Sequence, residues 1–270
     1  MTNLDNASNW WGGDGRGHNR LTMLELVSNN TLSAELAALL WLFIENKTSI
    51  LAAAGPQLAG KTTLLTALLD LAPPGYNFVL TKGRKEDFSF LNATDAASTY
   101  VLVPELSDHT PAYLWGDSVR TLFDALEGGY SMAATMHADS PEQVAHMLSQ
   151  PPVSIPAELL HHVGVIINIR LMYGERDMIR RVTGVTLVEP GPKFVSLTKS
   201  NDESGTTAVL HSDESKEAVA KRIGMPALES SLAHRQAILN EWLSEGTSDP
   251  AYYFERVAGF YESNPSNRSV

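Results

Sequence analysis

The segment from Gly55 to Thr62 carries the residue types and spacing that point most directly to chemistry. It reads Gly-Pro-Gln-Leu-Ala-Gly-Lys-Thr and fits the pattern G-x-x-x-x-G-K-[ST] without a mismatch. The glycines let the backbone curl so that successive N–H groups point inward and form an anion-binding nest. Lys61 would place a charge beside the β- and γ-phosphates of a nucleotide, and the Thr62 hydroxyl is a hard oxygen ligand for Mg²⁺.

The flanking sequence supports this interpretation of the loop. An apolar run at 49–54 precedes it and predicts a strand, and an amphipathic pattern at 61–71 predicts a helix whose positive end faces the phosphates. We therefore expect ATP and Mg²⁺ to bind here, with Thr62 as the protein's metal ligand. The residues expected to contact the nucleotide are Gly55, Pro56, Gln57, Leu58, Ala59, Gly60, Lys61, Thr62 and Thr63.

Two further polar residues follow apolar strands and are candidates for a catalytic role. Glu105 comes directly after the run Tyr100–Val103 and Pro104, at the place where P-loop enzymes carry an acidic residue on a neighbouring strand. Such a carboxylate holds the metal shell or positions the attacking water. His137 follows another strand, predicted at 131–135, and could donate to a γ-phosphate; a histidine bonded to a loop carbonyl is the alternative.

The elements that must position these residues alternate between α and β. Apolar runs predict strands, and amphipathic runs between them predict helices. The predicted strands lie at 49–54, 77–81, 100–103, 131–135, 163–170 and 180–188, and the predicted helices at 33–45, 61–71, 115–126 and 141–148. Strands separated by helices favour a largely parallel sheet that is covered on both faces.

The ends of the chain differ from this alternating part. Residues 1–20 are rich in Gly, Asn and Asp and are expected to be flexible. After a polar link at 201–205, helical patterns at 215–223, 227–243 and 250–261 predict a small helical appendage. The expected organisation is a flexible N-terminus at 1–20, an α/β core at 21–200 and a C-terminal helical appendage at 201–270.

Composition excludes several other classes of protein. The 270 residues contain no cysteine, so neither disulfides nor thiolate metal sites are available. The formal net charge of −11 argues against a nucleic-acid partner, because sequence-independent binding needs clustered Lys and Arg. We find no apolar run of about 20 residues and no signal-peptide pattern at the N-terminus. The expected location is the cytoplasm.

Taken in order, these segments resemble the ATPase superfamily that powers type II and type IV secretion, type IV pili and archaeal flagella. That family combines a loop of the form GPxGxGKTT, a strand ending V-G-E-x-R-D and a histidine motif T-x-H-x-x-S. The counterparts here are Gly55–Thr63, Val103–Asp108 and Thr135–Ser140. The resemblance covers roughly residues 21–265. It implies a RecA-like core, a ring that is usually a hexamer, and work on a membrane-bound machine at the cytoplasmic face.

The sequence also departs from the family pattern. The family's separate N-terminal domain, which supplies arginines to a neighbouring site, has no counterpart here, so the chain is expected to be a compact member. Pro104 stands where the family has Gly, and Ser107 stands where it has Arg. Because arginine beside a γ-phosphate contributes strongly to the rate, these losses predict weak or partner-dependent turnover. Arg84 and Arg120 are the candidates for replacing them in trans.

The leading interpretation is an ATP-hydrolysing motor subunit in which Glu105 acts on water and His137 senses the γ-phosphate. Its expected partners are further copies in a ring or a partner motor subunit, together with an inner-membrane platform protein. The alternative is a catalytically weak module in which ATP switches affinity for a partner protein. A small-molecule kinase would need an Arg-rich lid, and a GTPase would need an N-K-x-D segment, which is missing here.

Overall fold

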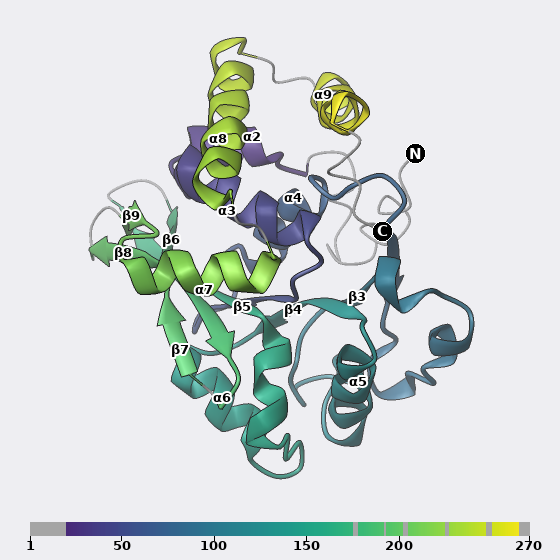
Figure 1. The fold of residues 1–270 in the computed structure, drawn as a ribbon. Helices are drawn as coiled ribbons and strands as arrows, with labels where there is room; N and C mark the ends of the chain where they lie inside the picture. Colours follow the sequence, from purple (N-terminus) through teal and green to yellow (C-terminus); the bar gives the residue numbers. More distant parts are fainter. Residues whose placement is uncertain are drawn as a thin grey trace.

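A seven-stranded sheet with a parallel centre organises the protein (Figure 1). The computed structural model describes residues 20–174, 178–191, 193–201, 205–224, 227–246 and 250–264. The sheet order is β2-β3-β4-β1-β5-β6-β7. The first five of these strands run parallel, and β6 and β7 are antiparallel additions at one edge. The strands are β1 Ile50–Ala53, β2 Asn77–Leu80, β3 Thr99–Val103, β4 Ser131–Met136, β5 Val165–Tyr173, β6 Met178–Glu189 and β7 Lys193–Ser196.

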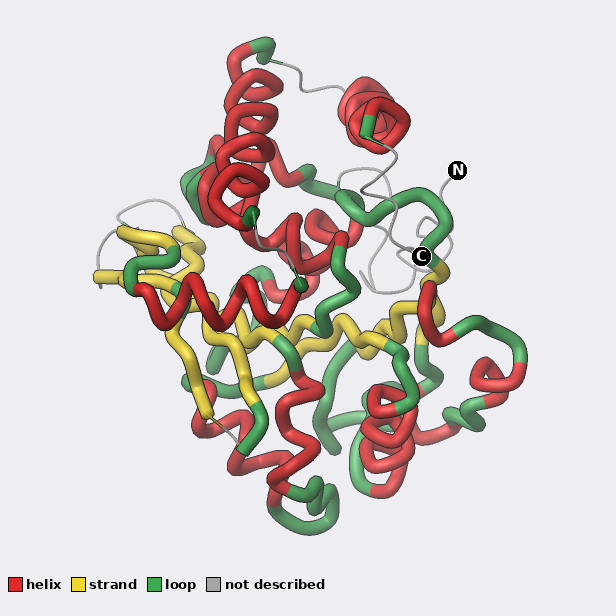
Figure 2. The backbone as a smooth tube through the Cα atoms, viewed as in Figure 1, coloured by secondary structure: helices red, strands yellow, loops and turns green. Residues whose placement is uncertain are grey.

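Helices cover both faces of this sheet, and Figure 2 shows them in red above and below the yellow strands. The α-helices are α2 Met23–Ser28, α3 Ala34–Glu45, α4 Lys61–Leu69, α5 Asp117–Glu127, α6 Pro141–Ser149, α7 Asp213–Ile223, α8 Leu228–Ser244 and α9 Pro250–Ser263. Short 3₁₀ helices are η2 Gly83–Lys85, η3 Ser89–Asn92, η4 Ala96–Ser98 and η5 Ala157–Val163. Apolar residues of α2, α3, α4, α8 and α9 share one hydrophobic cluster, and those of α5, α6 and η5 share the other.

Strand β1 is buried on both sides because its residues alternate between these two clusters. Ile50 and Ala52 belong to the cluster beneath α3 and α4, whereas Leu51 and Ala53 belong to the opposite one. A continuous apolar run is therefore what a central parallel strand requires. Helix α3 is apolar on nearly every side, and it is almost fully buried against α4 and α8.

The α/β class and the RecA-like core with a largely parallel sheet are confirmed. Sequence patterns placed these elements well because caps and periodicity are local: Ser33 accepts a hydrogen bond from Leu36 N–H, and Ser140 accepts one from Gln143 N–H ahead of Pro141. The predicted N-terminal segment at 1–20 lies outside the described residues except for Arg20.

The expectation of a polar link at 201–205 followed only by helices is wrong. Strands β8 (Thr198–Asn201) and β9 (Gly205–Val209) pair antiparallel beside the main sheet. Their sequence is mostly polar and lacks a hydrophobic alternation, so no pattern predicts them. Val209 joins the main hydrophobic cluster, and polar contacts to β6 also hold the pair. The Thr206 hydroxyl donates to Val182 O at 2.9 Å, and the Thr198 hydroxyl accepts from Val185 N at 3.0 Å.

The C-terminal helices pack closely on the sheet-covering layer. Helix α8 contacts α3. Tyr261 of α9 also contacts α3: Trp41 Nε1 donates to the Tyr261 hydroxyl at 2.8 Å, and this hydroxyl donates to Leu71 O at 2.7 Å. The domain boundaries at 20 and 200 stay predictions. No helix among the described residues is long and apolar enough to cross a membrane.

Candidate functional site

The loop between β1 and α4 presents backbone amides and one buried cation. Gly60, with φ +94°, precedes the first residue of α4, and no side chain caps this helix. The N–H groups of the first turn are thus left for an anion. Lys61 is 7% exposed, and its ammonium has no hydrogen-bond acceptor among the residues described. Burial lowers the pKa of Lys61, and the charge of Glu105 partly offsets that effect.

Glu105 lies at the end of β3 and is held by three side chains. It is 6% exposed. The Ser107 hydroxyl donates to its Oε1 at 2.9 Å, and His109 Nδ1 lies 3.7 Å from the same oxygen. The other oxygen, Oε2, faces His137 Nε2 at 3.3 Å. Both carboxylate oxygens are therefore engaged, and the group is oriented rather than free to rotate.

His137 connects the acidic residue to the loop. Its Nδ1 lies 2.8 Å from the carbonyl oxygen of Gly55, and because a carbonyl can only accept, Nδ1 must carry a proton and donate. His137 therefore lies between the loop and the acidic residue, with its Nε2 3.3 Å from Oε2 of Glu105.

The first glycine of the loop lies against a carboxylate that the motif does not contain. A Cβ built on Gly55 would clash with Oδ1 of Asp139. The backbone of Asp139 is held, since its N–H donates to Gln143 Oε1 at 2.7 Å and its carbonyl accepts from Asn168 Nδ2 at 3.2 Å. A side chain at position 55 would therefore force the Asp139 carboxylate to turn away from the loop.

The outer side of the loop is tied to strand β6. Leu58 has φ +60°, the left-handed region that is costly for residues with a Cβ. Arg180 Nε donates to the carbonyl of Leu58 at 3.0 Å, and its Cδ would lie 3.0 Å from a Cβ on Gly60. Arg180 therefore lies along the loop and holds the strained residue in place.

The structure brings most of the predicted site together. Gly55, Lys61, Glu105 and His137 are joined by the contacts above. Thr62 and Thr63 lie half-buried in the first turn of α4, and Thr62 O accepts from the Thr66 hydroxyl at 2.9 Å. Pro56 and Gln57 are exposed on the loop, and Ala59 is buried.

One detail of the sequence interpretation is wrong. The strand that carries Glu105 is not the neighbour of β1, because β4 lies between them. Registers pair Val103 of β3 with Ala134 of β4, and Met136 of β4 with Ala53 of β1. His137, at the end of β4, therefore stands between the loop and Glu105.

The residues present fit a bound Mg²⁺ of the phosphate-bridged kind. Such an ion keeps several waters and takes only one or two protein oxygens besides the phosphates. The described part of the chain holds no group of three or more His, Asp or Glu that could bind a metal by itself. The Thr62 hydroxyl in the first turn, with Glu105 close to Lys61, meets the smaller requirement.

Sequence reasoning missed Asp139, Arg180, Ser107 and His109 as parts of the site. The arginines it offered instead make other contacts: Arg84 Nη2 donates to Asp108 O at 2.9 Å, and Arg120 Nη1 donates to Val153 O at 3.0 Å. Their roles in a neighbouring subunit's site stay a prediction.

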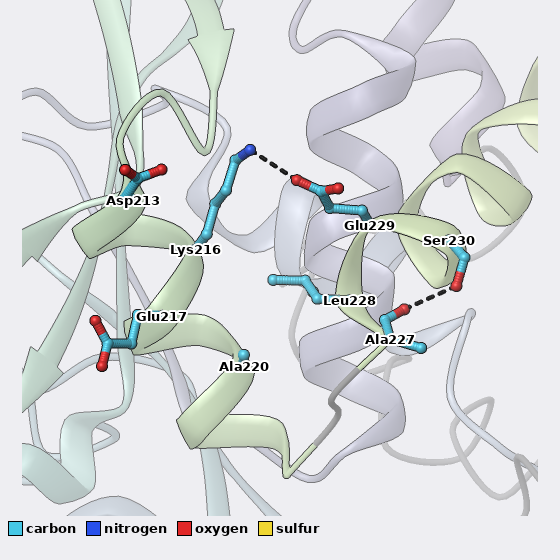
Figure 3. A pocket seen from close by; sticks show the side chains of 8 residues that line it. All are labelled: Asp213, Lys216, Glu217, Ala220, Ala227, Leu228, Glu229 and Ser230. Atoms are coloured by element: carbon cyan, nitrogen blue, oxygen red, sulfur yellow. Dashed lines mark hydrogen bonds and ion pairs between the residues drawn. The ribbon is translucent and has the colours of Figure 1, made fainter.

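A surface hollow elsewhere does not compete as the site. It lies between α7 and α8 (Figure 3), where Lys216 Nζ reaches Glu229 Oε1 at 2.7 Å. The Glu229 side chain is largely exposed and that of Lys216 is about half exposed, and Figure 3 shows Asp213 and Glu217 on the same helix as Lys216. None of the residues Gly55–Thr63 lines this hollow.

Fold and loop together define the class: a RecA-like α/β protein with a G-x-x-x-x-G-K-T loop between its central strand and a helix. No model of a known protein family matches the chain. The uncharacterized protein MJ1287 of Methanocaldococcus jannaschii is 30% identical over 198 residues, which cover 63% of this chain and 70% of that protein. The chain belongs to the same family as MJ1287.

Other proteins are similar over smaller shares of their length. The uncharacterized protein MJ0900 of the same organism is 25% identical over 186 residues, which are 63% of this chain and 34% of MJ0900. The VirB11 ATPase of the Brucella suis type IV secretion system is 18% identical with a TM-score of 0.40, over 69% of this chain and 62% of that one. The ATPase DotB of Yersinia pseudotuberculosis is 12% identical with a TM-score of 0.41, over 86% and 62%. Likenesses this weak carry no argument about function.

Proposed function

We propose that the chain binds ATP with Mg²⁺ in the loop Gly55–Thr63 and hydrolyses it as a motor subunit of a secretion or type IV pilus-like machine. The observation that carries the ATPase part is the convergence of a buried lysine, a buried carboxylate and a histidine on one loop. The motor part is supported by the three motifs Gly55–Thr63, Val103–Asp108 and Thr135–Ser140, which occur in the order of the secretion and pilus ATPases.

Each residue has a defined task in this proposal. The loop amides and Lys61 hold the phosphates, and the Thr62 hydroxyl is the protein ligand of Mg²⁺, which neutralises the charge on the phosphates when bound. Glu105 accepts a hydrogen bond from the attacking water and orients it. Ser107 keeps the carboxylate in position by donating to Oε1.

His137 would couple the γ-phosphate to Glu105. Its Nε2 faces Oε2 of Glu105. A γ-phosphate beside Lys61 would be a competing partner of higher charge for this ring nitrogen. Transfer of the contact from Glu105 to the phosphate would free Oε2 of Glu105 for the water, so that the carboxylate acts when ATP is bound.

A second candidate function is an ATP-dependent switch that acts on a partner protein with negligible turnover. It is favoured by the engagement of both Glu105 oxygens and by Pro104 and Ser107 at positions where the family has Gly and Arg. In either case the partners are proposed to be further copies in a ring, or a partner motor subunit at the cytoplasmic face of a membrane.

Steady-state phosphate release with Mg-ATP tests the choice, measured on the full chain beside Lys61→Ala and Glu105→Gln. The motor proposal expects turnover that both substitutions abolish, with ATP binding lost only in Lys61→Ala. A wild type that binds ATP but releases phosphate no faster than Glu105→Gln would support the switch. Sedimentation with and without ATP would show whether nucleotide assembles the ring.

A further inference from the structure

Large apolar side chains are exposed at three positions of the described chain, and all three belong to one region. Leu58 on the loop is 66% exposed, and Tyr173 and Met178 on the β5–β6 hairpin are 80% and 53% exposed. Scattered single apolar residues are ordinary on a protein surface, but three that gather beside a candidate ligand site are informative.

On the β5–β6 hairpin, the face that packs on the hydrophobic core continues past the last buried residues. Register pairs Ile169 with Val182, then Leu171 with Arg180, then Tyr173 with Met178. Side chains alternate along a strand, so these three pairs share one face of the hairpin. Ile169 and Val182 are buried in the cluster beneath α4. Tyr173 and Met178 continue that face to a point where the described residues leave both side chains exposed.

The contacts of Arg180 show that this exposed face lies beside the loop. It is the middle member of the series on β6, and its guanidinium donates to Leu58 O while its stem runs beside Gly60. Tyr173 and Met178 lie one pair farther along, roughly 7 Å at the rise of a β-strand. This is a step that an α-phosphate and a ribose can span from a phosphate held in the loop.

We propose that Tyr173 and Met178, bordered by Leu58, form the surface on which the purine base of the bound nucleotide stacks. The inference rests on the proposed nucleotide function and adds the base subsite to it. The tyrosine ring supplies a π-face and the methionine sulfur packs against an aromatic edge, so this surface would hold the base of the proposed ATP by stacking. The occupant is a nucleoside and not a protein because the face is continuous with the loop that holds the phosphates.

The test compares two ligands by titration calorimetry, Mg-ATP and magnesium tripolyphosphate, which shares the phosphates but lacks the base. Wild type is compared with Tyr173→Ser and Met178→Ser, and Tyr173→Phe serves as the matched control because it keeps the ring. We expect Tyr173→Ser to weaken ATP binding about tenfold, as loss of one base–aromatic stack does, with tripolyphosphate affinity unchanged and Tyr173→Phe close to wild type.

Different failures have different meanings. If Tyr173→Ser binds ATP as wild type does, the base subsite is wrong and the ATPase proposal stands. If it binds ATP normally but changes the sedimentation of the protein, the face is a contact between proteins and the subsite is again wrong. If neither ligand binds to wild type, the proposed function falls and the subsite falls with it.

Discussion

A buried ion pair joins the helix that precedes the loop strand to the C-terminal helices, and breaking it should destabilise the whole protein. Arg235 of α8 reaches Glu45 of α3 through Nη2 to Oε1 at 2.7 Å, Nη2 to Oε2 at 2.6 Å and Nε to Oε2 at 3.1 Å. The side chains are 2% and 3% exposed. The guanidinium also lies 5.8 Å from the ring of Trp41 and 5.3 Å from that of Phe260.

Removing one partner leaves the other buried without compensation, so Arg235→Met should lower the free energy of unfolding by about 3–5 kcal/mol. That is a large share of the roughly 5–15 kcal/mol that holds a typical domain together. Replacing both partners with apolar residues, as Glu45→Leu with Arg235→Met, removes both desolvation costs. The double variant should therefore regain most of the loss.

The cost of Arg235→Met should also depend on pH. Burial raises the pKa of Glu45 above its ordinary 4.5, and Arg235 opposes that rise. Without Arg235 the folded-state pKa rises further, so the folded chain holds a proton that the unfolded chain gives up above pH 4.5. Wild type and variant both lose stability as the pH rises above 4.5, but the variant goes on losing it above the folded-state pKa of Glu45 in the wild type. The destabilisation caused by the substitution therefore grows above that pKa and shrinks below it.

Urea unfolding followed by tryptophan fluorescence measures these effects, because Trp41 and Trp242 lie beside the pair with ring centroids 5.9 Å apart. The matched control is Lys216→Met with Glu229→Leu, a solvated pair whose loss should have little effect. The reasoning fails if Arg235→Met costs less than about 1 kcal/mol. It also fails if the double variant loses as much as both single variants combined.

Three other outcomes follow from the site. Burial lowers the pKa of Lys61, and a bound phosphate would raise that pKa again. ATP affinity should therefore fall as the pH rises through the lowered pKa, and ATP binding should take up protons. Calorimetry in two buffers over a range of pH checks this, and an affinity that does not change with pH would contradict it. Gly55→Ala should weaken ATP binding because the new Cβ would clash with Asp139, and the double variant Gly55→Ala with Asp139→Ala should recover part of the loss. If Gly55→Ala and the double variant bind ATP with equal affinity in a filter-binding assay, the contact with Asp139 is not the cause. Arg180→Met keeps the aliphatic part of the side chain but removes the hydrogen bond to the Leu58 carbonyl, so hydrogen exchange of the loop amides should become faster. Unchanged exchange rates would show that this hydrogen bond does not hold the loop.

Sequence alone could predict the loop, most helices and the parallel strands, because each depends on neighbours within a few residues. The pair Ser140–Pro141 marks a helix start wherever it lies in the fold, and Gly224, with φ +62°, marks a helix end in the same local way. The loop pattern between an apolar run and a helical run is equally local.

Contacts that complete the site join residues that are distant in sequence, and no pattern announces them. Arg180 meets Leu58 across 122 positions, and Arg235 meets Glu45 across 190. Leu58 shows this limit: its left-handed backbone stands where the pattern GPxGxGKTT has glycine, and the hydrogen bond to its carbonyl comes from an arginine on a distant strand. The strands β8 and β9 escaped for a related reason, since bonds to β6 hold them.

The place of β4 explains why Glu105 and His137 meet at the loop. Parallel strands end at one edge of a sheet, so residues just past β1, β3 and β4 converge there whatever their distance in sequence. Because β4 is the middle strand of the three, His137 can contact both sides, Gly55 O through Nδ1 and Glu105 through Nε2. A phosphate that draws on Nε2 or shifts Gly55 must therefore also change the contact to Glu105. One side chain thus links occupancy of the loop to the state of the carboxylate.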